Sequence, residues 1–407
     1  MTAERSDTGA AVSPRRSLRI ALVGSRGIPG RYGGYETLFA ELAPRLVTRG
    51  FDVTVYCRST TSGSAARSTG RRDPARPTRR AHYRGARLVH LPTIRTKHLD
   101  TPVHTLLSCL HATGERFDAA LVVNSANALF LPLLSAAGTP SVLNVDGIEK
   151  RRAKWGAFGR AVFALSERLA CFLPDLLVTD AEVIRAHYLE RYAAPSAIVT
   201  YGVDARPLWQ SGVLRRLALE KRNYFLYVSR FEPENNPHRV VEAYRQVGGE
   251  TPLVMVGGAP YASAFIASFS AGADPRIRFP GPIYGRGYRQ LLSHAMVYIH
   301  ATEVGGTHPA LVEAMGYGNC LVVNDTPENR EVAGDVALYF RADAPATLAA
   351  LLDRLRCDPQ EIARRGRAAA TRAFERYNWE TIADQYAGLL RTAAGAGSDA
   401  GASPGIG

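Results

Sequence analysis

The chain has 407 residues, and at roughly 150 residues per domain this length predicts two or three domains. Hydrophobic residues make up 46% of it and charged residues 21%, which excludes wholesale disorder. The net charge is +13, and part of the excess lies in residues 61–84, which hold seven arginines and one aspartate. Five cysteines show no metal or disulfide spacing and favour a reducing compartment, namely Cys57, Cys109, Cys171, Cys320 and Cys357.

Short runs of β-branched residues recur along the chain and predict buried strands. The first set covers 18–24, 52–58, 86–92, 118–124, 140–146, 175–180 and 197–203. After residue 204 the pattern restarts, with runs at 223–230, 252–258, 276–282, 296–302 and 320–325. Helical stretches separate most of these runs. The alternation predicts an α/β chain with two Rossmann-like, doubly wound parallel-sheet domains that face each other across a cleft.

Composition places the boundaries of these domains. We assign residues 18–204 to the N-terminal domain and 205–377 to the C-terminal domain. Small and polar residues predict disorder over 1–17 and 394–407, and residues 59–83 read as a flexible basic loop.

Two stretches raise the question of a membrane. Residues 119–145 carry no charge and are long enough to span a bilayer, but their Asn, Pro and Gly residues indicate strand, helix and strand instead. Residues 151–173 form a basic amphipathic helical pattern, which fits either packing on a sheet or contact with an anionic membrane surface. The N-terminus lacks the apolar run of a secretion signal. We expect a cytoplasmic protein, with peripheral contact at the inner face of the membrane left open.

Ligands of doubly wound sheets bind at the carboxyl ends of the strands, so the loops there are the candidate sites. The loop from Gly24 to Gly34 is glycine-rich and precedes a helix, a place suited to anions, although its glycines also suit a turn that needs them for geometry alone. Its spacing is not G-x-G-x-x-G, and the second strand ends at Arg58 rather than at an acidic residue. A nicotinamide dehydrogenase is therefore disfavoured.

A second glycine turn opens a helix in the C-terminal half. Pro309 marks the helix start, and the amides of the preceding Gly-Gly-Thr-His turn could hold a pyrophosphate. Glu313 lies on the same helix face and could accept hydrogen bonds from a ribose diol, although a solvated helix-start glutamate is the alternative. Arg230, at the end of a strand, could clamp a diphosphate.

Two aspartates also end predicted strands. Asp146 could bond or deprotonate an acceptor hydroxyl, or could be a turn aspartate bonded to nearby amides. Asp180 is predicted to be a helix N-cap. No Asp-x-Asp occurs, and the histidines at 98, 104 and 111 have no ligand spacing, so we expect no metal and no cofactor. Positive groups and helix amides would stabilise a departing diphosphate instead.

Several of these segments together carry a family resemblance. The stretches RGIPGRYGGYETLFAELAPRL, NVDGIEKRRAKWG, YVSRFEPENNPHRVVEAY and VGGTHPALVEAMGYG are similar to those of GT-B fold glycosyltransferases of family 4 type. More narrowly, the chain resembles the bacterial branch that contains rhamnosyltransferases, over nearly all of Leu18 to Leu390. The resemblance implies that a final helix, 378–393, crosses back onto the first domain.

The resemblance also implies roles for matching positions. Arg230, Asp146 and Glu313 would be the catalytic residues, with Arg230 on the donor diphosphate and Glu313 on the nucleotide ribose. The remaining donor-binding residues would be Gly33, Gly34, Asn235, Gly305, Gly306, Thr307 and His308. Tyr32, Gly147 and Glu149 would join Asp146 in binding the acceptor.

The chain departs from the wider family at two of these positions. Gly305 stands where the wider family has a glutamate, and Asn235 stands where it often has a lysine. Glu303 is a candidate substitute for the missing carboxylate.

The implied activity is transfer of a sugar with retention of configuration. The branch points to L-rhamnose from dTDP-rhamnose and to a saccharide acceptor on a polyprenyl diphosphate, in cell-surface polysaccharide synthesis. The alternatives are a non-catalytic nucleotide-sugar-binding protein and a sugar-nucleotide epimerase. Nucleic acid is not expected as a partner, because the chain shows no reading helix, zinc module or aromatic stacking ribbon.

Overall fold

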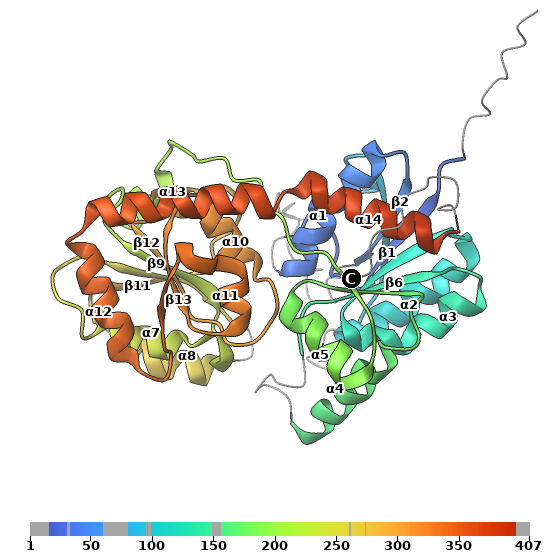
Figure 1. Cartoon of the computed structure of the whole chain (residues 1–407), viewed down its shortest axis with the longest axis horizontal. Coiled ribbons are helices and arrows are strands. Elements are labelled where there is room, and N and C mark those ends of the chain that lie inside the picture. Colours follow the sequence, from blue (N-terminus) through green and yellow to red (C-terminus); the bar gives the residue numbers. More distant parts are fainter. Residues whose placement is uncertain are drawn as a thin grey trace, which may run out of the picture.

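The computed structural model has two α/β halves side by side, each a sheet covered by helices on both faces (Figure 1). This confirms the predicted fold class. The structure describes residues 16–30, 33–59, 80–94, 96, 99–148, 156–259, 262–272 and 274–395.

The N-terminal sheet has the strand order β3-β4-β2-β1-β5-β6-β7-β8. Its strands pair in parallel except for the β3–β4 hairpin, and chain order reverses between β1 and β5. The strands are β1 (Arg19–Val23), β2 (Asp52–Arg58), β3 (His82–Tyr83), β4 (Ala86–Leu91), β5 (Ala119–Val123), β6 (Ser141–Val145), β7 (Leu176–Thr179) and β8 (Ala197–Ile198). The helices are α1 (Gly34–Thr48), α2 (Asp100–Glu115), η1 (Ser125–Phe130), α3 (Leu131–Ala136), α4 (Ala157–Leu169) and α5 (Glu182–Tyr192).

The C-terminal sheet repeats this plan in the order β11-β10-β9-β12-β13-β14, all parallel, with the reversal between β9 and β12. Its strands are β9 (Phe225–Arg230), β10 (Leu253–Gly258), β11 (Ile277–Gly281), β12 (Val297–His300), β13 (Cys320–Asn324) and β14 (Leu338–Phe340). The helices are α6 (Gly212–Arg216), η3 (Pro233–Asn235), α7 (Pro237–Tyr244), α8 (Ser263–Ser270), α9 (Gly285–His294), α10 (Pro309–Gly316), α11 (Pro327–Ala333), η4 (Gly334–Val336), α12 (Pro345–Arg356), α13 (Pro359–Arg376) and α14 (Trp379–Ala393).

The strands are apolar because each sheet is buried on both faces. Every residue of β5 is fully buried, with its side chains alternating between two cores. One core packs under α1 and α14, and the other under α2, α3 and α5. In the C-terminal sheet α9, α10 and α13 cover one face, while α7, α8 and α12 cover the other. This burial explains why continuous apolar runs predict these strands.

The twelve predicted strands are all present, and residues 119–145 form strand, helices and strand as expected. Two strands were not predicted. These strands are β3 and β14. β3 occupies the end of the predicted basic loop, so the loop ends before His82 rather than at residue 83. Residues 60–79 of that loop lie outside the described residues. α4 covers Ala157–Leu169 of the predicted 151–173 helix, and residues 151–155 lie outside the described residues. Within the described ranges, no helix has the length and apolarity needed to cross a membrane.

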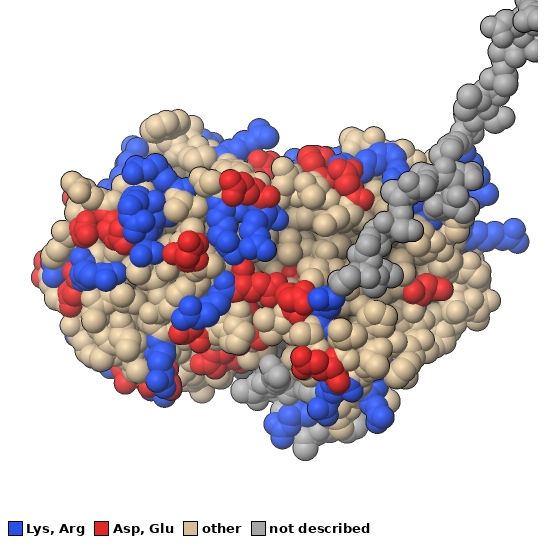
Figure 2. All heavy atoms as spheres, viewed as in Figure 1, with Lys and Arg blue, Asp and Glu red and all other residues tan. Residues whose placement is uncertain are grey.

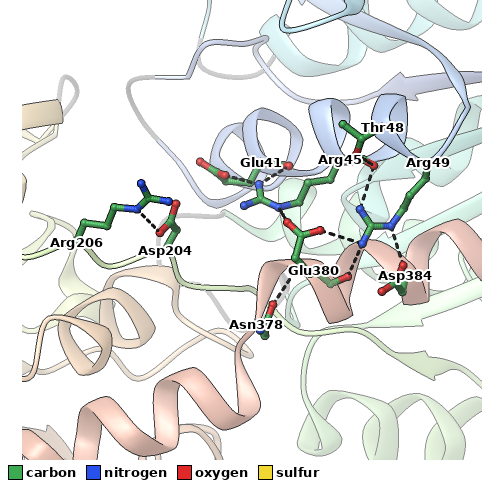
Figure 3. Close-up of polar contacts among 9 residues, drawn as sticks. All are labelled: Glu41, Arg45, Thr48, Arg49, Asp204, Arg206, Asn378, Glu380 and Asp384. Carbon is green, nitrogen blue, oxygen red and sulfur yellow. Dashed lines mark hydrogen bonds and ion pairs between the residues drawn. The ribbon is translucent and has the colours of Figure 1, made fainter.

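Two segments connect the halves and lie side by side. Val203 forms a parallel bridge with Asn378, and its N–H donates to the Tyr377 carbonyl over 2.7 Å. α14 then continues onto the N-terminal half and packs on α1 (Figure 1). Arg45 of α1 and Arg49, the C-cap of that helix, bind the Glu380 carboxylate, and Arg49 also binds Asp384 over 2.7 Å (Figure 3). These contacts join residues more than 300 positions apart.

Candidate active site

The loops at the carboxyl ends of the two sheets contact each other. A Cβ added to Gly147 would lie 3.3 Å from the Gly305 Cα, and one added to Gly34 would lie 3.5 Å from Cγ of Pro309. The helix starts of α1 and α10 therefore meet at the junction of the domains. Each loop lies at or beside the point where its sheet reverses strand order, which is where ligands bind in such sheets.

Glu36 organises the first glycine-rich loop. Its Oε1 accepts a hydrogen bond from the Arg26 N–H over 2.8 Å, and a Cβ at Gly33 would lie 2.1 Å from Oε2. Gly33 also has a φ of +113°, so both space and backbone conformation require glycine. Burial raises the pKa of Glu36. Sequence reasoning missed this residue, although a glutamate two positions after a double glycine was its signal. Tyr32 lies outside the described residues.

Asp146 directly follows β6 at the domain junction and is half-buried. Its carbonyl accepts a hydrogen bond from the Gly306 N–H over 3.0 Å. Burial raises the pKa of Tyr35 and of Tyr201, and the nearby charge of Asp146 raises both further. Both phenols therefore stay neutral beside Asp146. Of the other predicted acceptor residues, Gly147 is buried here, and Glu149 is outside the described residues.

Asp180 does not have its predicted role. The N-cap of α5 is Ala181, whose methyl group cannot cap a helix, and Asp180 instead contacts the other domain. Its Oδ2 accepts from the Thr307 N–H over 2.9 Å, and its carbonyl accepts from Thr307 Oγ1 over 2.5 Å. Complete burial and the charge of Asp146 raise the pKa of Asp180. The expected N-cap is thus an interdomain contact.

Arg230 ends β9, and its side chain is 37% exposed. A guanidinium nitrogen lies 3.5 Å from Glu232 Oε1, which leaves much of the group accessible to an anion. Asn235 is buried, and its Nδ2 donates to the Arg230 carbonyl over 2.8 Å. Asn235 therefore positions the loop that carries Arg230, rather than directing its amide to the donor as expected.

Glu313 lies on α10 and faces α9 and the N-terminal domain. The Tyr288 hydroxyl donates to its Oε2 over 2.7 Å. Burial raises the pKa of Glu313, the Tyr288 hydrogen bond opposes the rise, and the charge of Glu41 on α1 adds to it. The alternative of a solvated helix-start glutamate does not fit this environment.

The turn before α10 is already engaged by the N-terminal domain. A Cβ at Gly306 would lie 2.0 Å from Asp180 Oδ1, and Gly305 has a φ of +146°. The N–H groups of Gly306 and Thr307 bond to Asp146 and Asp180, as given above, so in this arrangement they do not face an open gap. The pyrophosphate contact expected of these two amides is replaced by a domain contact. His308 is the N-cap of α10, with its ring 4.9 Å from that of His300.

A cavity of about 340 Å³ opens at the carboxyl ends of β9, β12 and β14. At its rim the Asn236 amide donates to Glu303 Oε1 over 2.8 Å. Its lining comprises Pro233, Glu234, Asn236, His238, Arg239, Glu303, Val304, Ala342 and Asp343. Among the residues that the structure describes, no three His, Cys, Asp or Glu side chains are grouped to hold a metal ion.

Comparisons with known proteins match this architecture. A model of the glycosyl transferase 4-like domain matches residues 33–203, and a model of glycosyl transferases group 1 matches residues 215–372. No curated protein has a significant sequence match to the chain. Both family models describe transferases, which favours transfer over the epimerase and binding-only alternatives.

Solved structures share the fold at low identity. Sucrose-phosphate synthase from Thermosynechococcus elongatus aligns with a TM-score of 0.76 and 19% identity, over 92% of this chain and 98% of the other. HepE from Anabaena, in complex with UDP and glucose, gives 0.72 and 14%, over 92% and 100%. Trehalose 6-phosphate synthase from Burkholderia multivorans gives 0.65 and 14%, over 95% and 99%. The chain belongs to the glycosyltransferases of GT-B fold, with a glycosyl transferase 4-like domain followed by a group 1 domain.

Proposed function

We propose that the enzyme transfers a sugar with retention from a nucleotide-sugar donor to a saccharide carried on a polyprenyl diphosphate. The donor lies on the C-terminal domain and the acceptor on the N-terminal domain. A structure of HepE holds UDP-glucose, which supports a nucleotide sugar, and the resemblance to rhamnosyltransferases supports dTDP-rhamnose. The observation that carries the proposal is an accessible Arg230 at the reversal point of the C-terminal sheet.

In the proposed reaction the acceptor oxygen bonds to the anomeric carbon as the bond from that carbon to the diphosphate breaks. The acceptor proton passes to the departing diphosphate on the same face. Arg230 neutralises the charge that develops there, and the N-terminal end of α10 adds a favourable dipole. Glu313 accepts hydrogen bonds from the ribose, and Asp146 orients the acceptor hydroxyl.

The cavity beside the Arg230 loop has the chemistry of a sugar subsite. Carboxylates of Glu234 and Glu303 accept hydrogen bonds from hydroxyl groups, while Arg239 supplies donors. Its volume suits a single small ligand. We assign the transferred sugar to this cavity, with Glu303 in place of the carboxylate that Gly305 lacks.

The test is transfer and binding with a panel of nucleotide sugars. Arg230→Ala should remove most transfer and weaken binding of the matching nucleoside diphosphate at least tenfold, because one charge-assisted contact contributes about 1.5–3 kcal/mol. Arg245→Ala is the control, since Arg245 is exposed at the opposite end of α7. Unchanged transfer by Arg230→Ala would defeat the phosphate assignment, and absence of nucleotide binding by the wild type would defeat the proposed donor.

Exposed apolar side chains on neighbouring elements of the N-terminal domain support the proposed membrane contact. These side chains are Leu106 and Leu110 of α2, Leu129 of η1, Leu165 of α4 and Phe172, and α2 and α4 both pack on η1. Phe172 is 72% exposed. Figure 2 shows Lys and Arg interspersed with Asp and Glu on the face it displays, rather than the single basic stripe of a nucleic-acid-binding protein.

The proposed surface predicts binding to vesicles that contain anionic lipid. Phe172→Glu should reduce this binding, because a charge replaces an apolar group at the interface. Trp209→Glu is the control, because Trp209 is 87% exposed but lies before α6 in the C-terminal domain. Equal loss in both variants, or no loss in either, would contradict the assignment.

A further inference from the structure

A carboxylate of the C-terminal domain caps a helix of the N-terminal domain. Glu331 of α11 accepts the Glu182 N–H at Oε1 over 2.6 Å and the Val183 N–H at Oε2 over 3.1 Å. The first amides of a helix have no partner within the helix, and Ala181 at the N-cap cannot supply one. Glu331 therefore caps the N-terminus of α5, a role that a side chain at the N-cap position usually has.

The same segment of the N-terminal domain receives a second contact. Asp180 binds Thr307 through its carboxylate and through its carbonyl, as described above. The hydrogen bond from Gly306 to the Asp146 carbonyl lies beside it. Asp180 and the start of α5 are thus held by two different elements of the C-terminal domain, the turn before α10 and the helix α11. We call these five hydrogen bonds the closure contact.

The fit at the closure contact leaves little space for sliding. Asp180 is fully buried, and the Gly306 Cα packs against its carboxylate so closely that any side chain there would overlap it. A shift of the domains would break the hydrogen bonds together and expose the start of α5. In Figure 1, α10 and α11 lie on the side of the C-terminal half that faces α5 and α1.

The closure contact joins the two sides of the reaction. The turn that binds Asp180 leads directly into α10 and Glu313, on the donor side. Asp146, whose carbonyl accepts the hydrogen bond from the Gly306 N–H, directly follows β6 on the acceptor side. A displacement of about 1 Å between reacting groups can reduce a rate by two orders of magnitude, so the register of these elements matters for transfer.

We propose that Asp180 and Glu331 are positioning residues that hold the two domains in the register required for sugar transfer. When they are engaged, the donor side and the acceptor side face each other at reacting distance. When they separate, the gap opens for exchange of substrate and product, and the first turn of α5 loses its cap. The inference rests on the proposed placement of donor and acceptor on opposite domains.

The first test measures closure without any substrate. Amide hydrogen exchange at residues 182 and 183 should be at least tenfold faster in Glu331→Ala than in the wild type. Glu182→Ala is the matched control, because the Glu182 side chain binds Arg185 while its backbone amide still reaches Glu331. Unchanged exchange in Glu331→Ala would overturn the proposal. Asp180→Ala is measured in parallel, and thermal unfolding shows whether that buried variant is folded.

The second test separates positioning from binding. Glu331→Ala should lower kcat for transfer at least tenfold and change the Kd for the nucleoside diphosphate less than threefold. Asp180→Asn should retain more of kcat than Asp180→Ala, because the amide oxygen still accepts from Thr307. Wild-type kcat in Glu331→Ala, or an equal loss in Glu182→Ala, would overturn the positioning role. If the wild type transfers no sugar but exchange responds as expected, the proposed function fails and the closure contact stands.

Discussion

Replacing Tyr288 by Phe should weaken donor binding through Glu313 and do so most at low pH. The hydroxyl of Tyr288 donates to Glu313 Oε2 over 2.7 Å and stabilises the ionised carboxylate. Burial raises the pKa of Glu313, and this hydrogen bond opposes the rise. A hydrogen bond to a charged group contributes about 1.5–3 kcal/mol, and because Glu313 is only half-buried the lower value applies. Loss of this hydrogen bond therefore destabilises the ionised carboxylate by about 1.5 kcal/mol and raises the pKa of Glu313 further.

The direction in which donor affinity changes with pH depends on which protonation state of Glu313 binds the ribose. Only the ionised carboxylate accepts two hydrogen bonds from a ribose diol, so affinity falls as pH falls through the pKa of Glu313. In Tyr288→Phe this fall in affinity should begin at a higher pH than in the wild type. Stability of the unliganded enzyme has the opposite sign, because a carboxyl whose pKa is raised by folding contributes less stability as pH rises through that value.

Calorimetric titration of the nucleoside diphosphate between pH 5 and 8 measures this shift. Tyr298→Phe is the matched control, because Tyr298 is buried beside Glu313 but its hydroxyl donates to the Val228 carbonyl. A profile for Tyr288→Phe that superimposes on the wild type, or a shift of equal size in Tyr298→Phe, would refute the role assigned to this hydrogen bond.

Three further predictions concern the helix that joins the domains and its packing. Tyr386→Phe should lower the free energy of unfolding by about 1–3 kcal/mol, since the buried Asn144 Nδ2 loses its partner at 2.9 Å. A loss below about 0.5 kcal/mol in denaturant unfolding would contradict this. Gly202→Ala should cost about 1–3 kcal/mol, because a Cβ would lie 2.5 Å from the Trp379 ring. Gly388→Ala in α14 meets no atom within 4 Å and should instead stabilise by up to about 1 kcal/mol; equal effects of the two glycine changes would argue against the packing account.

The fold was predictable because a strand buried on both faces of a parallel sheet is a continuous run of apolar residues. β5 reads as five apolar residues in a row, all of them buried. β3 has only two residues and pairs antiparallel, and β14 has three residues with two half-exposed, so neither gives such a run. The length of the buried segment therefore decides which strands can be predicted.

The candidate site was predictable only where topology alone places a residue. Arg230 follows from the end of a strand at the reversal of the sheet. The direction of Asn235 does not follow, because its amide turns back to the Arg230 carbonyl. Asp180 and Glu331 bind partners 127 and 149 positions away, across a contact between two separately folded sheets. No local sequence pattern predicts these interdomain hydrogen bonds. The position of Asp180, after a strand and before a helix, predicts an N-cap instead.

The glycine-rich loops illustrate how one composition can have two physical causes. Close approach of a ligand and close approach of a protein side chain both require the absence of a Cβ. In this enzyme Gly33 lies against the Glu36 carboxylate and Gly306 lies against the Asp180 carboxylate. Both neighbours are buried acids, so these two glycines are explained by intramolecular packing. It follows that the proposed leaving group depends mainly on Arg230 and the helix starts, and that the glycine turn before α10 contributes chiefly by fixing where they lie.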